Sequence, residues 1–311
     1  MTEKEKYRLF CQTEKELPIF VKDWYLDAIC GGGNWGVVLV EKNDRIIATL
    51  PFFVKKRMGF KYIIMPPLVK TMGPYLIAEV RDLKYSHQYY QELISLLPKV
   101  DGFKQDFHSS VSNWLPFYWK GYRQTTRYTY TIELGDLDKV YAGLNRNMKR
   151  NIKKAKTLLR VETHHSLSTF YELNQMSFDR QEVSIPYSFG FLEKKDQALA
   201  KNQARQMLFA VDEQDRIHSA AYLIWDDTTA YYHLSGDNPE FRNSGSGIFL
   251  IWESIKYAQE KIGLTRFDFE GSMMKNIEPI RRQFGARQES YFRVWRYHNL
   301  LYQMLDWRWK P

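Results

Sequence analysis

Two halves of the chain repeat one another. A similar segment occurs twice, 171 residues apart: Val40-Glu-Lys-Asn-Asp-Arg-Ile46 and Val211-Asp-Glu-Gln-Asp-Arg-Ile217. Two shorter matches follow in the same order, at offsets of 162 and 164: Gln105–His108 with Phe267–Glu270, and Gly121–Gln124 with Gly285–Gln288. Three matches in one order predict an internal duplication, so one fold should occur twice in 311 residues.

The repeat also indicates which elements each copy contains. An alternating apolar strand stands before each polar turn and another follows it, which predicts a β-hairpin in both copies. Each copy then reads as a further strand, a helix, a strand, a short helix and a final strand. The expected hairpin strands are 35–40 with 46–54 and 207–211 with 219–225, the long helices are 87–97 and 247–262, and the final strands are 127–134 and 290–297.

This order predicts an α/β (α+β) fold class, with two tandem domains whose mixed, largely antiparallel sheets are flanked by helices. We expect the domains to be residues 1–135 and 136–311, because a Gly-Asp turn follows the first final strand. The last residues, about 14 in number, are expected to pack back on the first domain. Apolar residues at 44% and charged residues at 26% exclude a disordered or fibrous chain.

The excess of positive charge lies in one place. The net charge is +9, and residues 145–160 hold seven cations and no acid, so the rest of the chain carries +2. Apolar residues recur there at helical spacing from Tyr141 to Leu159, which predicts an amphipathic helix. Solvated charge is one reading of this helix. The other is binding of acceptor, tRNA or polymer phosphates, with these residues as candidates: Arg146, Lys149, Arg150 and Lys153.

A glycine-rich loop stands before the long helix of the second copy only. The sequence Arg-x-x-Gly-x-Gly follows a predicted strand, 229–235, and opens directly into the helix. Free backbone N–H groups and the helix dipole bind anions at such a junction, although glycines can also serve only to shape a turn. We expect a phosphate site formed by six consecutive residues: Arg242, Asn243, Ser244, Gly245, Ser246 and Gly247.

The order of hairpin, strand, Arg-x-x-Gly-x-Gly loop, helix and strand resembles the GNAT acyltransferase fold. In that fold a loop of this pattern grips the pyrophosphate of acyl-CoA, so the resemblance implies acyl-CoA, such as acetyl-CoA, as the donor. Two such domains, with a basic stretch opening the second and Phe267–Gly271 followed by Arg282–Ala286, resemble the tandem, Fem-type (FemAB-like) branch. That branch includes cell-wall aminoacyltransferases that use aminoacyl-tRNA. This chain shows no long charged helical insertion of the kind that forms a coiled-coil arm in some of them.

Three residues are candidates for catalysis. Asp268 and Glu270 share one face near a strand's end, where a carboxylate could deprotonate or bind an amine; ion pairs with Arg266 and Arg282 are the structural alternative. Glu270 is the better candidate, because it stands next to Gly271. His233 shares a strand face with Tyr231 and Ser235, and could act as a base or as a hydrogen-bonded sheet residue.

These features support three hypotheses. The first is an N-acyltransferase that moves an acyl group from acyl-CoA to an amine, a small molecule or cell-wall precursor, held between the domains. The alternative is a Fem-type aminoacyltransferase that uses aminoacyl-tRNA. The third is a degenerate, non-catalytic module that binds an anionic polymer.

Other classes of protein are not indicated. No apolar stretch approaches the roughly 18 residues of a membrane span, and no secretory signal pattern is seen. With two cysteines, we expect a reducing, cytoplasmic location. No DNA partner is expected, and no metal, because His164 and His165 show no third ligand.

Overall fold

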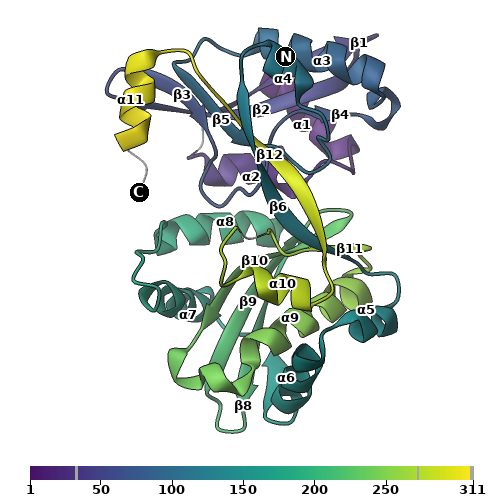
Figure 1. The fold of residues 1–311 in the computed structure, drawn as a ribbon, viewed down its shortest axis with the longest axis vertical. Coiled ribbons are helices and arrows are strands. Elements are labelled where there is room, and N and C mark those ends of the chain that lie inside the picture. Colours follow the sequence, from purple (N-terminus) through teal and green to yellow (C-terminus); the bar gives the residue numbers. More distant parts are fainter. Residues whose placement is uncertain (32–33, 272, 309–311) are drawn as a thin grey trace. The chain divides into compact units, whose positions relative to one another are not determined.

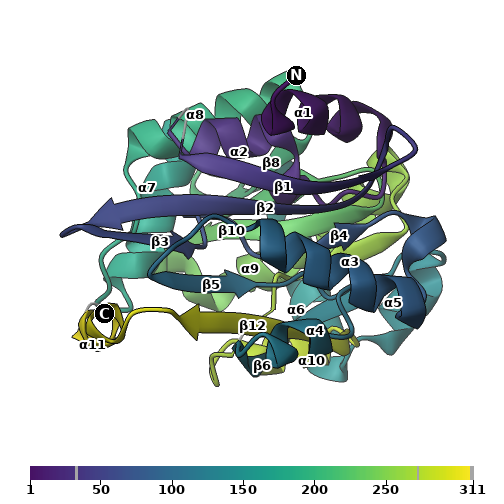
Figure 2. The same ribbon diagram turned by 90° about the horizontal axis from the view of Figure 1, so that it is seen from above.

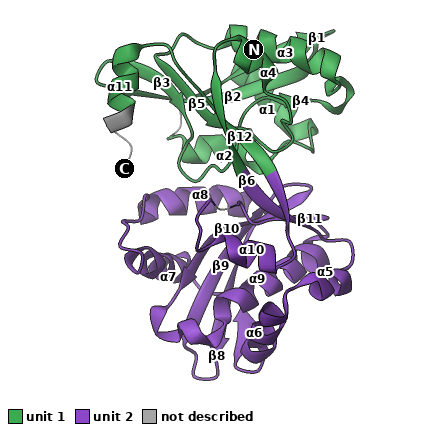
Figure 3. Ribbon diagram, viewed as in Figure 1, with its two compact units in different colours: residues 1–127, 290–311 green, residues 128–289 purple. Residues whose placement is uncertain are grey.

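The chain divides into two compact units in the computed structural model, which describes residues 1–31, 34–271 and 273–308. Unit 1 is formed by Met1–Arg127 with Ser290–Pro311, and unit 2 by Tyr128–Glu289 (Figure 3). The boundary expected between residues 135 and 136 assumed that each copy keeps its own final strand. The units are divided differently, after Arg127 and before Ser290.

Unit 1 is a sheet with helices packed against it (Figure 1). Its strand order is β1-β2-β3-β5-β12, with β4 beside β2. The pair β3–β5 is parallel and the other pairs are antiparallel; Figure 2 shows β1 and β2 side by side. The elements are α1 (Glu3–Thr13), η1 (Ile19–Val21), α2 (Asp23–Ile29), β1 (Trp35–Lys42), β2 (Arg45–Arg57), β3 (Phe60–Ile64), β4 (Tyr75–Leu76), η2 (Ala78–Val80), α3 (Leu83–Leu96), β5 (Gly102–Asp106), α4 (Leu115–Trp119), β12 (Arg287–Tyr297) and α11 (Leu300–Arg308).

Unit 2 repeats this plan and adds helices. Its strand order is β6-β11-β10-β9-β8-β7, and its parallel pair is β10–β11. The elements are β6 (Arg123–Glu133), α5 (Leu137–Gly143), α6 (Arg146–Lys156), β7 (Leu159–Glu162), α7 (Leu167–Asp179), α8 (Phe189–Lys201), β8 (Arg205–Asp212), β9 (Ile217–Trp225), β10 (Thr229–Asp237), η3 (Pro239–Ser244), α9 (Ser246–Lys256), η4 (Tyr257–Ile262), β11 (Arg266–Asp268) and α10 (Glu278–Gln283).

Each unit is completed by the final strand of the other copy. In unit 1, β5 pairs with β12, where Asp106 lies opposite Arg293. In unit 2, β11 pairs with β6, where Asp268 lies opposite Thr131. The matched Asp-Phe segments of the two copies therefore occupy equivalent positions, and this exchange of strands explains where the units divide.

The repeated turns have a local physical reason. Asp44 and Asp215 both adopt a left-handed backbone, with φ of 58° and 61°. Asp tolerates this conformation better than most residues, because its short side chain can bond to the nearby backbone. Each turn joins the antiparallel hairpin that the sequence predicted, β1–β2 and β8–β9.

The core of unit 2 lies on both faces of its sheet. On one face α6 and α9 bury residues such as Ile152 and Leu250 against alternate residues of the strands, including Leu208, Leu223 and Tyr232. On the other face α7 packs along β9 and β10 (Figure 1). Phe170 of α7 contacts Tyr222 of β9, with ring centroids 5.3 Å apart.

Two expectations about local structure need correction. The basic helix was expected to continue through Arg160, but α6 ends at Lys156. Arg160 lies in β7, which pairs with β8 because an alternating Leu-Arg-Val-Glu segment fits a half-buried strand at the edge of the sheet. The alternation expected along β10 is also interrupted, since its register with β9 shifts between Tyr232 and Leu234.

The helix α11 packs within unit 1. Tyr302 is buried and stacks on Tyr62, with ring centroids 5.0 Å apart. Asp306 accepts hydrogen bonds of 2.7 Å from Lys104 Nζ and from the Tyr297 hydroxyl. Over the described part of the chain, no helix has the length and apolarity that crossing a membrane requires.

Candidate functional site

The candidate site lies where the parallel strands β10 and β11 separate. Their pairing runs from Thr229–Arg266 to Tyr231–Asp268 and then stops. Beyond that point β10 continues to Asp237, whereas the chain after β11 turns at Glu270 and Gly271. Ligands of α/β sheets bind outside the carboxyl ends of parallel strands, so this is the expected place for a site.

Glu270 is held in a conformation that few residues adopt. Its φ is 56°, in the left-handed region, and Gly271 follows with φ of 69°. A Cβ at Gly271 would collide with the carbonyl oxygen of Tyr128, so only glycine fits there. Left-handed backbone at a residue other than glycine costs roughly 1–2 kcal/mol and clusters at functional sites.

The three predicted catalytic residues come together around this turn. Glu270 Oε1 lies 2.5 Å from His233 Nδ1, and the Glu270 N–H donates to Asp268 Oδ1 over 2.7 Å. The hydroxyl of Thr129 donates to the same Asp268 oxygen over 2.5 Å. Burial raises the pKa of the Asp268 carboxyl to about 6, although both of these hydrogen bonds favour its ionised form.

Their exposure separates their possible roles. The His233 side chain is 2% exposed and that of Glu270 is 13% exposed. His233 also lies at the register shift of β10, a type of irregularity that often re-aims a side chain beside a site. Glu270 is therefore the more accessible of the two, and His233 lies against its carboxylate on the buried side.

Two cations that sequence reasoning missed complete the cluster, the buried Lys195 and the half-buried Arg281. Lys195 of α8 is 0% exposed, and its Nζ has no hydrogen-bond partner among the described residues. Burial lowers the pKa of Lys195 to about 7, against the attraction of Glu270 and Asp196. Arg281 of α10 lies over the rings of Phe269 and Tyr232, at 5.0 and 5.6 Å, and burial lowers its pKa despite the attraction of Tyr232, Glu270 and Asp268.

The sequence of α8 contains a pattern from which the burial of Lys195 could have been predicted. Leu192 and Leu199 are buried, and at helical spacing Lys195 and Asp196 lie between them on the same face. Asp196 is satisfied there by the Tyr222 hydroxyl, which donates over 2.6 Å. A lysine on the apolar face of a helix needs a functional or structural reason, because burying its charge is costly.

The ion pairs considered as the structural alternative for Asp268 and Glu270 are replaced by others, because Arg266 and Arg282 pair with different acids. Arg266 Nη2 pairs with Glu289 at 2.6 Å, and Arg282 Nε pairs with Glu278 at 3.0 Å. Asp268 instead accepts a hydrogen bond from Thr129, and Glu270 lies against His233. The matching acid of unit 1 differs, since Asp106 forms a bidentate pair with Arg293 at 2.5 and 2.8 Å.

The predicted phosphate loop follows β10 directly. The segment 239–244 forms η3, Gly245 has φ of 81°, and α9 begins at Ser246. The N-cap residue of α9 is Gly245, which has no side chain to cap the helix, and the Ser246 N–H donates to Ser244 Oγ over 3.3 Å. The N–H groups that follow Ser246 are the ones that would meet an anion, whereas α7 and α8 are capped by Ser166 and Ser188. Arg242 and Asn243 are exposed on η3.

The glycines of this loop also have packing reasons. A Cβ at Gly245 would lie 3.3 Å from the carbonyl oxygen of Asn151 in α6. A Cβ at Gly247 would lie 3.1 Å from Asp237 Oδ1, which accepts a hydrogen bond of 2.7 Å from Ser219. Ser246 Oγ lies 2.5 Å from the same serine, so Ser246 is part of the support behind the loop.

The basic helix α6 lies beside the phosphate loop. Lys154 Nζ donates to the carbonyl oxygen of Asn243 over 3.2 Å, and Arg150 lies one turn before it on the same face. Lys149 instead donates to the carbonyl oxygen of Ala142 over 2.8 Å. The predicted anion-binding cations Arg146, Arg150 and Lys153 are exposed.

Comparison with known proteins identifies the fold. Residues 142–293 match a family model described as an acetyltransferase (GNAT) domain. The crystal structure of FemX superposes with a TM-score of 0.75 at 13% identity, covering 98% of this chain and 99% of FemX. A tandem GNAT protein from the clavulanic acid biosynthesis pathway gives 0.53 at 9% identity, covering 94% of this chain and 92% of that one.

A further solved structure shares the fold. The C-terminal domain of a putative lysylphosphatidylglycerol synthetase from Agrobacterium fabrum gives a TM-score of 0.54 at 11% identity, with coverage of 94% and 91%. No curated protein matches the sequence significantly. Together these findings confirm the expected GNAT-type fold in tandem-domain form and the resemblance to the Fem-type branch.

Proposed function

We propose that this acyltransferase, whose residues 142–293 form an acetyltransferase (GNAT) domain, takes its acyl group from acyl-CoA and transfers it to an amine. One observation carries the choice of donor: the uncapped start of α9, behind a glycine loop and beside the cations of α6. A pyrophosphate would meet backbone N–H groups, the positive helix end and Lys154 together. Arg242 and the residues up to Gly247 are its proposed contacts.

Glu270 is the proposed base. Its carboxylate takes a proton from the incoming ammonium, and the freed amine attacks the thioester carbonyl carbon to form the new C–N bond. The C–S bond then breaks, and a second proton from the nitrogen goes to the departing CoA thiolate. The products are an amide and free CoA, so no further reactant is needed.

The other members of the cluster act through Glu270. His233 fixes the orientation of the carboxylate, and Asp268 holds the backbone of the turn. The charges of Lys195 and Arg281 are attracted by Glu270, so both help to hold its carboxylate in place. We assign His233, Asp268, Lys195 and Arg281 as positioning residues.

A pocket in unit 1 is our candidate for binding the acceptor. Its volume is about 1070 Å³, and cations lie around a largely apolar lining that includes Trp295 and Leu301. The cations are Lys104, Arg123 and Arg293. Lys104 and Arg293 are already paired with Asp306 and Asp106, so the lining suits an acceptor that is mainly apolar, such as an amphipathic amine or the apolar part of a cell-wall precursor.

The alternative donor is aminoacyl-tRNA, as the resemblance to Fem-type enzymes implies. The exposed cations of α6 favour it, because they could bind a phosphate backbone. The longest continuous helix over the described residues is α9 with η4, residues 246–262, and it packs on the unit 2 sheet, so it forms no coiled-coil arm. Cys11 and Cys30 are buried and unpaired, which supports a reducing compartment, and we propose the cytoplasm.

Thermal unfolding with and without CoA tests the donor. CoA at millimolar concentration should raise the midpoint of the wild-type protein, and Arg242→Ala and Gly247→Asp should remove most of that shift. Lys261→Ala, which removes an exposed cation outside the loop, is the control. A wild-type protein that CoA does not stabilise, but that transfers amino acids from charged tRNA, would establish the alternative.

Glu270→Gln tests the base. We expect kcat to fall by roughly 10²–10⁴-fold with little change in the KM for acyl-CoA, because general base catalysis is lost and the loop is intact. Glu260→Gln, at an exposed position of η4, should keep full activity. Equal activity of Glu270→Gln and wild type would remove Glu270 from this role.

A further inference from the structure

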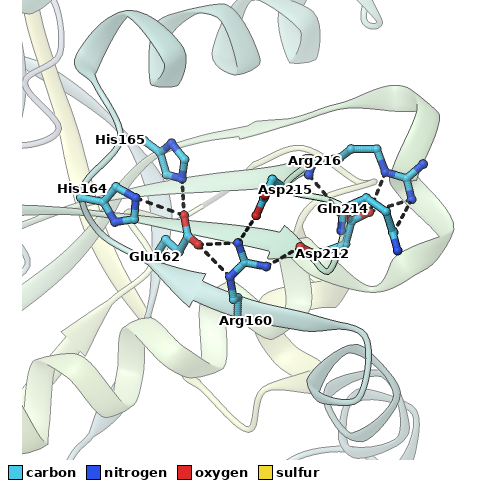
Figure 4. Close-up of polar contacts among 8 residues, drawn as sticks. All are labelled: Arg160, Glu162, His164, His165, Asp212, Gln214, Asp215 and Arg216. Carbon is cyan, nitrogen blue, oxygen red and sulfur yellow. Dashed lines mark hydrogen bonds and ion pairs between the residues drawn. The ribbon is translucent and has the colours of Figure 1, made fainter.

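Three potential metal ligands meet at the end of β7, at the edge of the unit 2 sheet. They are Glu162, His164 and His165, whose ligand atoms all lie within 4.8 Å of one another (Figure 4). No third ligand for the two histidines was expected from the sequence. Glu162 supplies it, because the chain turns after β7 and brings both imidazoles back to its carboxylate.

The geometry around the carboxylate suits a small cation. Glu162 Oε2 lies 2.6 Å from His165 Nε2 and 3.4 Å from His164 Nε2. Metal–ligand distances of about 2.0–2.2 Å in a tetrahedral site put ligand atoms roughly 3.3 Å apart, so small side-chain rotations would complete such a set. Two imidazoles with one carboxylate are typical ligands of zinc and similar divalent ions.

The Arg160 guanidinium fixes the orientation of the Glu162 carboxylate. Arg160 Nε binds the other oxygen, Glu162 Oε1, at 2.7 Å, and so fixes the carboxylate while Oε2 faces the histidines. The Arg160 guanidinium also pairs with Asp215 at 2.5 Å. Glu162, Arg160 and Asp215 together carry −1, so the net charge of this group attracts a cation. An arginine that orients a ligating carboxylate plays the part of an outer-shell residue.

Exposure would allow a metal ion to enter. The His164 side chain is 75% exposed, whereas those of His165 and Glu162 are 23% and 16% exposed. His165 is packed against Phe209, with ring centroids 4.9 Å apart, so one imidazole is already positioned. The exposed side of the cluster would be completed by water.

We propose that Glu162, His164 and His165 bind a divalent transition-metal ion of the zinc class. The ion would join the end of β7 to the start of α7, whose N-cap is Ser166. This proposal does not rest on the proposed donor or acyl-transfer chemistry, because its residues lie at the β7 edge of the sheet, four strands from β11.

The site would also stabilise the segment before the phosphate loop. The helix α7 lies so close to β10 that a Cβ at Gly236 would be 2.5 Å from the Asn174 backbone nitrogen. Asn174 Nδ2 donates to the Ser235 carbonyl oxygen over 2.6 Å, and the Asp237 N–H donates to Ser177 Oγ over 2.8 Å. A metal ion that fixes the start of α7 would therefore make β10 and the loop after it more rigid.

Titration of the full chain with Zn²⁺ after chelator treatment tests the proposal. We expect one ion per chain by calorimetry and a higher thermal midpoint. Co²⁺ should give the intense visible absorption of a tetrahedral nitrogen–oxygen site. No binding of either ion at micromolar concentrations would overturn the proposal.

Variants assign the binding to these residues. His164→Ala removes an exposed ligand without disturbing the core, and Glu162→Gln keeps the shape of the side chain. Each should weaken Zn²⁺ binding roughly tenfold or more and abolish the Co²⁺ spectrum. Glu172→Gln, on the exposed face of α7, should bind as the wild type does. Unchanged binding in both ligand variants would place the metal elsewhere and contradict the proposal.

Discussion

Lys195 occupies a position where an apolar side chain would stabilise unit 2. Its ammonium is fully buried, has no hydrogen-bond partner among the described residues, and lies 5.1 Å from the centre of the Tyr222 ring. Burying such a charge lowers stability, and the cost is greatest when the amine is protonated. A residue kept at this cost has a reason other than packing, and the attraction of Glu270 supplies one.

Replacement of Lys195 by methionine should separate stability from activity. With a pKa near 7 when folded and 10.5 when unfolded, Lys195 is charged in both states below about pH 7, and the cost is then fully present. As pH rises from 7 toward 10.5 the folded state loses the proton first, so wild-type stability increases. Lys195→Met should therefore raise the free energy of unfolding on the order of 2–4 kcal/mol at pH 6, and by less at pH 9.

Denaturant unfolding at the two pH values checks this, and Lys194→Met is a matched control because Lys194 is the exposed neighbour. We expect the activity of Lys195→Met to fall roughly tenfold or more, with an altered pH profile of kcat. If Lys195→Met has the same free energy of unfolding as the wild type at both pH values and is fully active, the amine is neither buried at a cost nor coupled to Glu270.

The cations of α6 lie on two sides of the helix, one facing the loop before α9 and the other facing α5. Lys154 and Arg150 lie toward the loop before α9, whereas Lys149 binds the backbone of α5. The charges were predicted from the sequence as one group. The structure indicates that only part of the group can contribute to a donor site in the loop.

Charge reversal should reveal this division. Arg150→Glu with Lys154→Glu should weaken CoA binding roughly tenfold or more and make it less dependent on salt. Lys149→Glu with Lys153→Glu should leave CoA binding nearly unchanged, and should weaken only a larger polyanion such as tRNA. Calorimetry at two salt concentrations measures both, and equal losses from the two pairs would mean that the helix acts as a uniform patch.

Local patterns revealed some elements and not others. Alternation of apolar residues gave both hairpins, and the motif Arg-x-x-Gly-x-Gly placed the start of α9 to within one residue. The end of α6 was missed because Leu159 fits a helical stripe as well as the strand that β8 stabilises. The contact of Glu270 with His233 was not predictable, since it depends on a left-handed turn and a register shift that no local pattern records.

At the scale of the whole molecule, the exchange of final strands makes the two copies interdependent. Unit 1 needs β12 to cover β5, and unit 2 needs β6 to cover β11. A sheet edge that loses its partner exposes unpaired backbone groups. The two sequence repeats therefore do not coincide with the two folding units, which are residues 1–127 with 290–311 and residues 128–289.

Fragments should reflect the folding units. Residues 1–135 alone should lack a cooperative unfolding transition, whereas residues 1–127 joined by a flexible linker to residues 290–311 should show one. Circular dichroism during thermal unfolding makes the comparison. A cooperative transition in the 1–135 fragment would mean that β6 can replace β12 beside β5.

The exchange also bears on how the chain is made. Arg293, which binds Asp106 of β5, is synthesised 187 residues after it. At 5–20 residues per second a ribosome would take roughly ten to forty seconds to deliver it. During that interval β5 is an open edge, and β6 emerges early enough to occupy it. Correct assembly therefore requires that β6 be kept from β5, or released from it, before translation reaches β12.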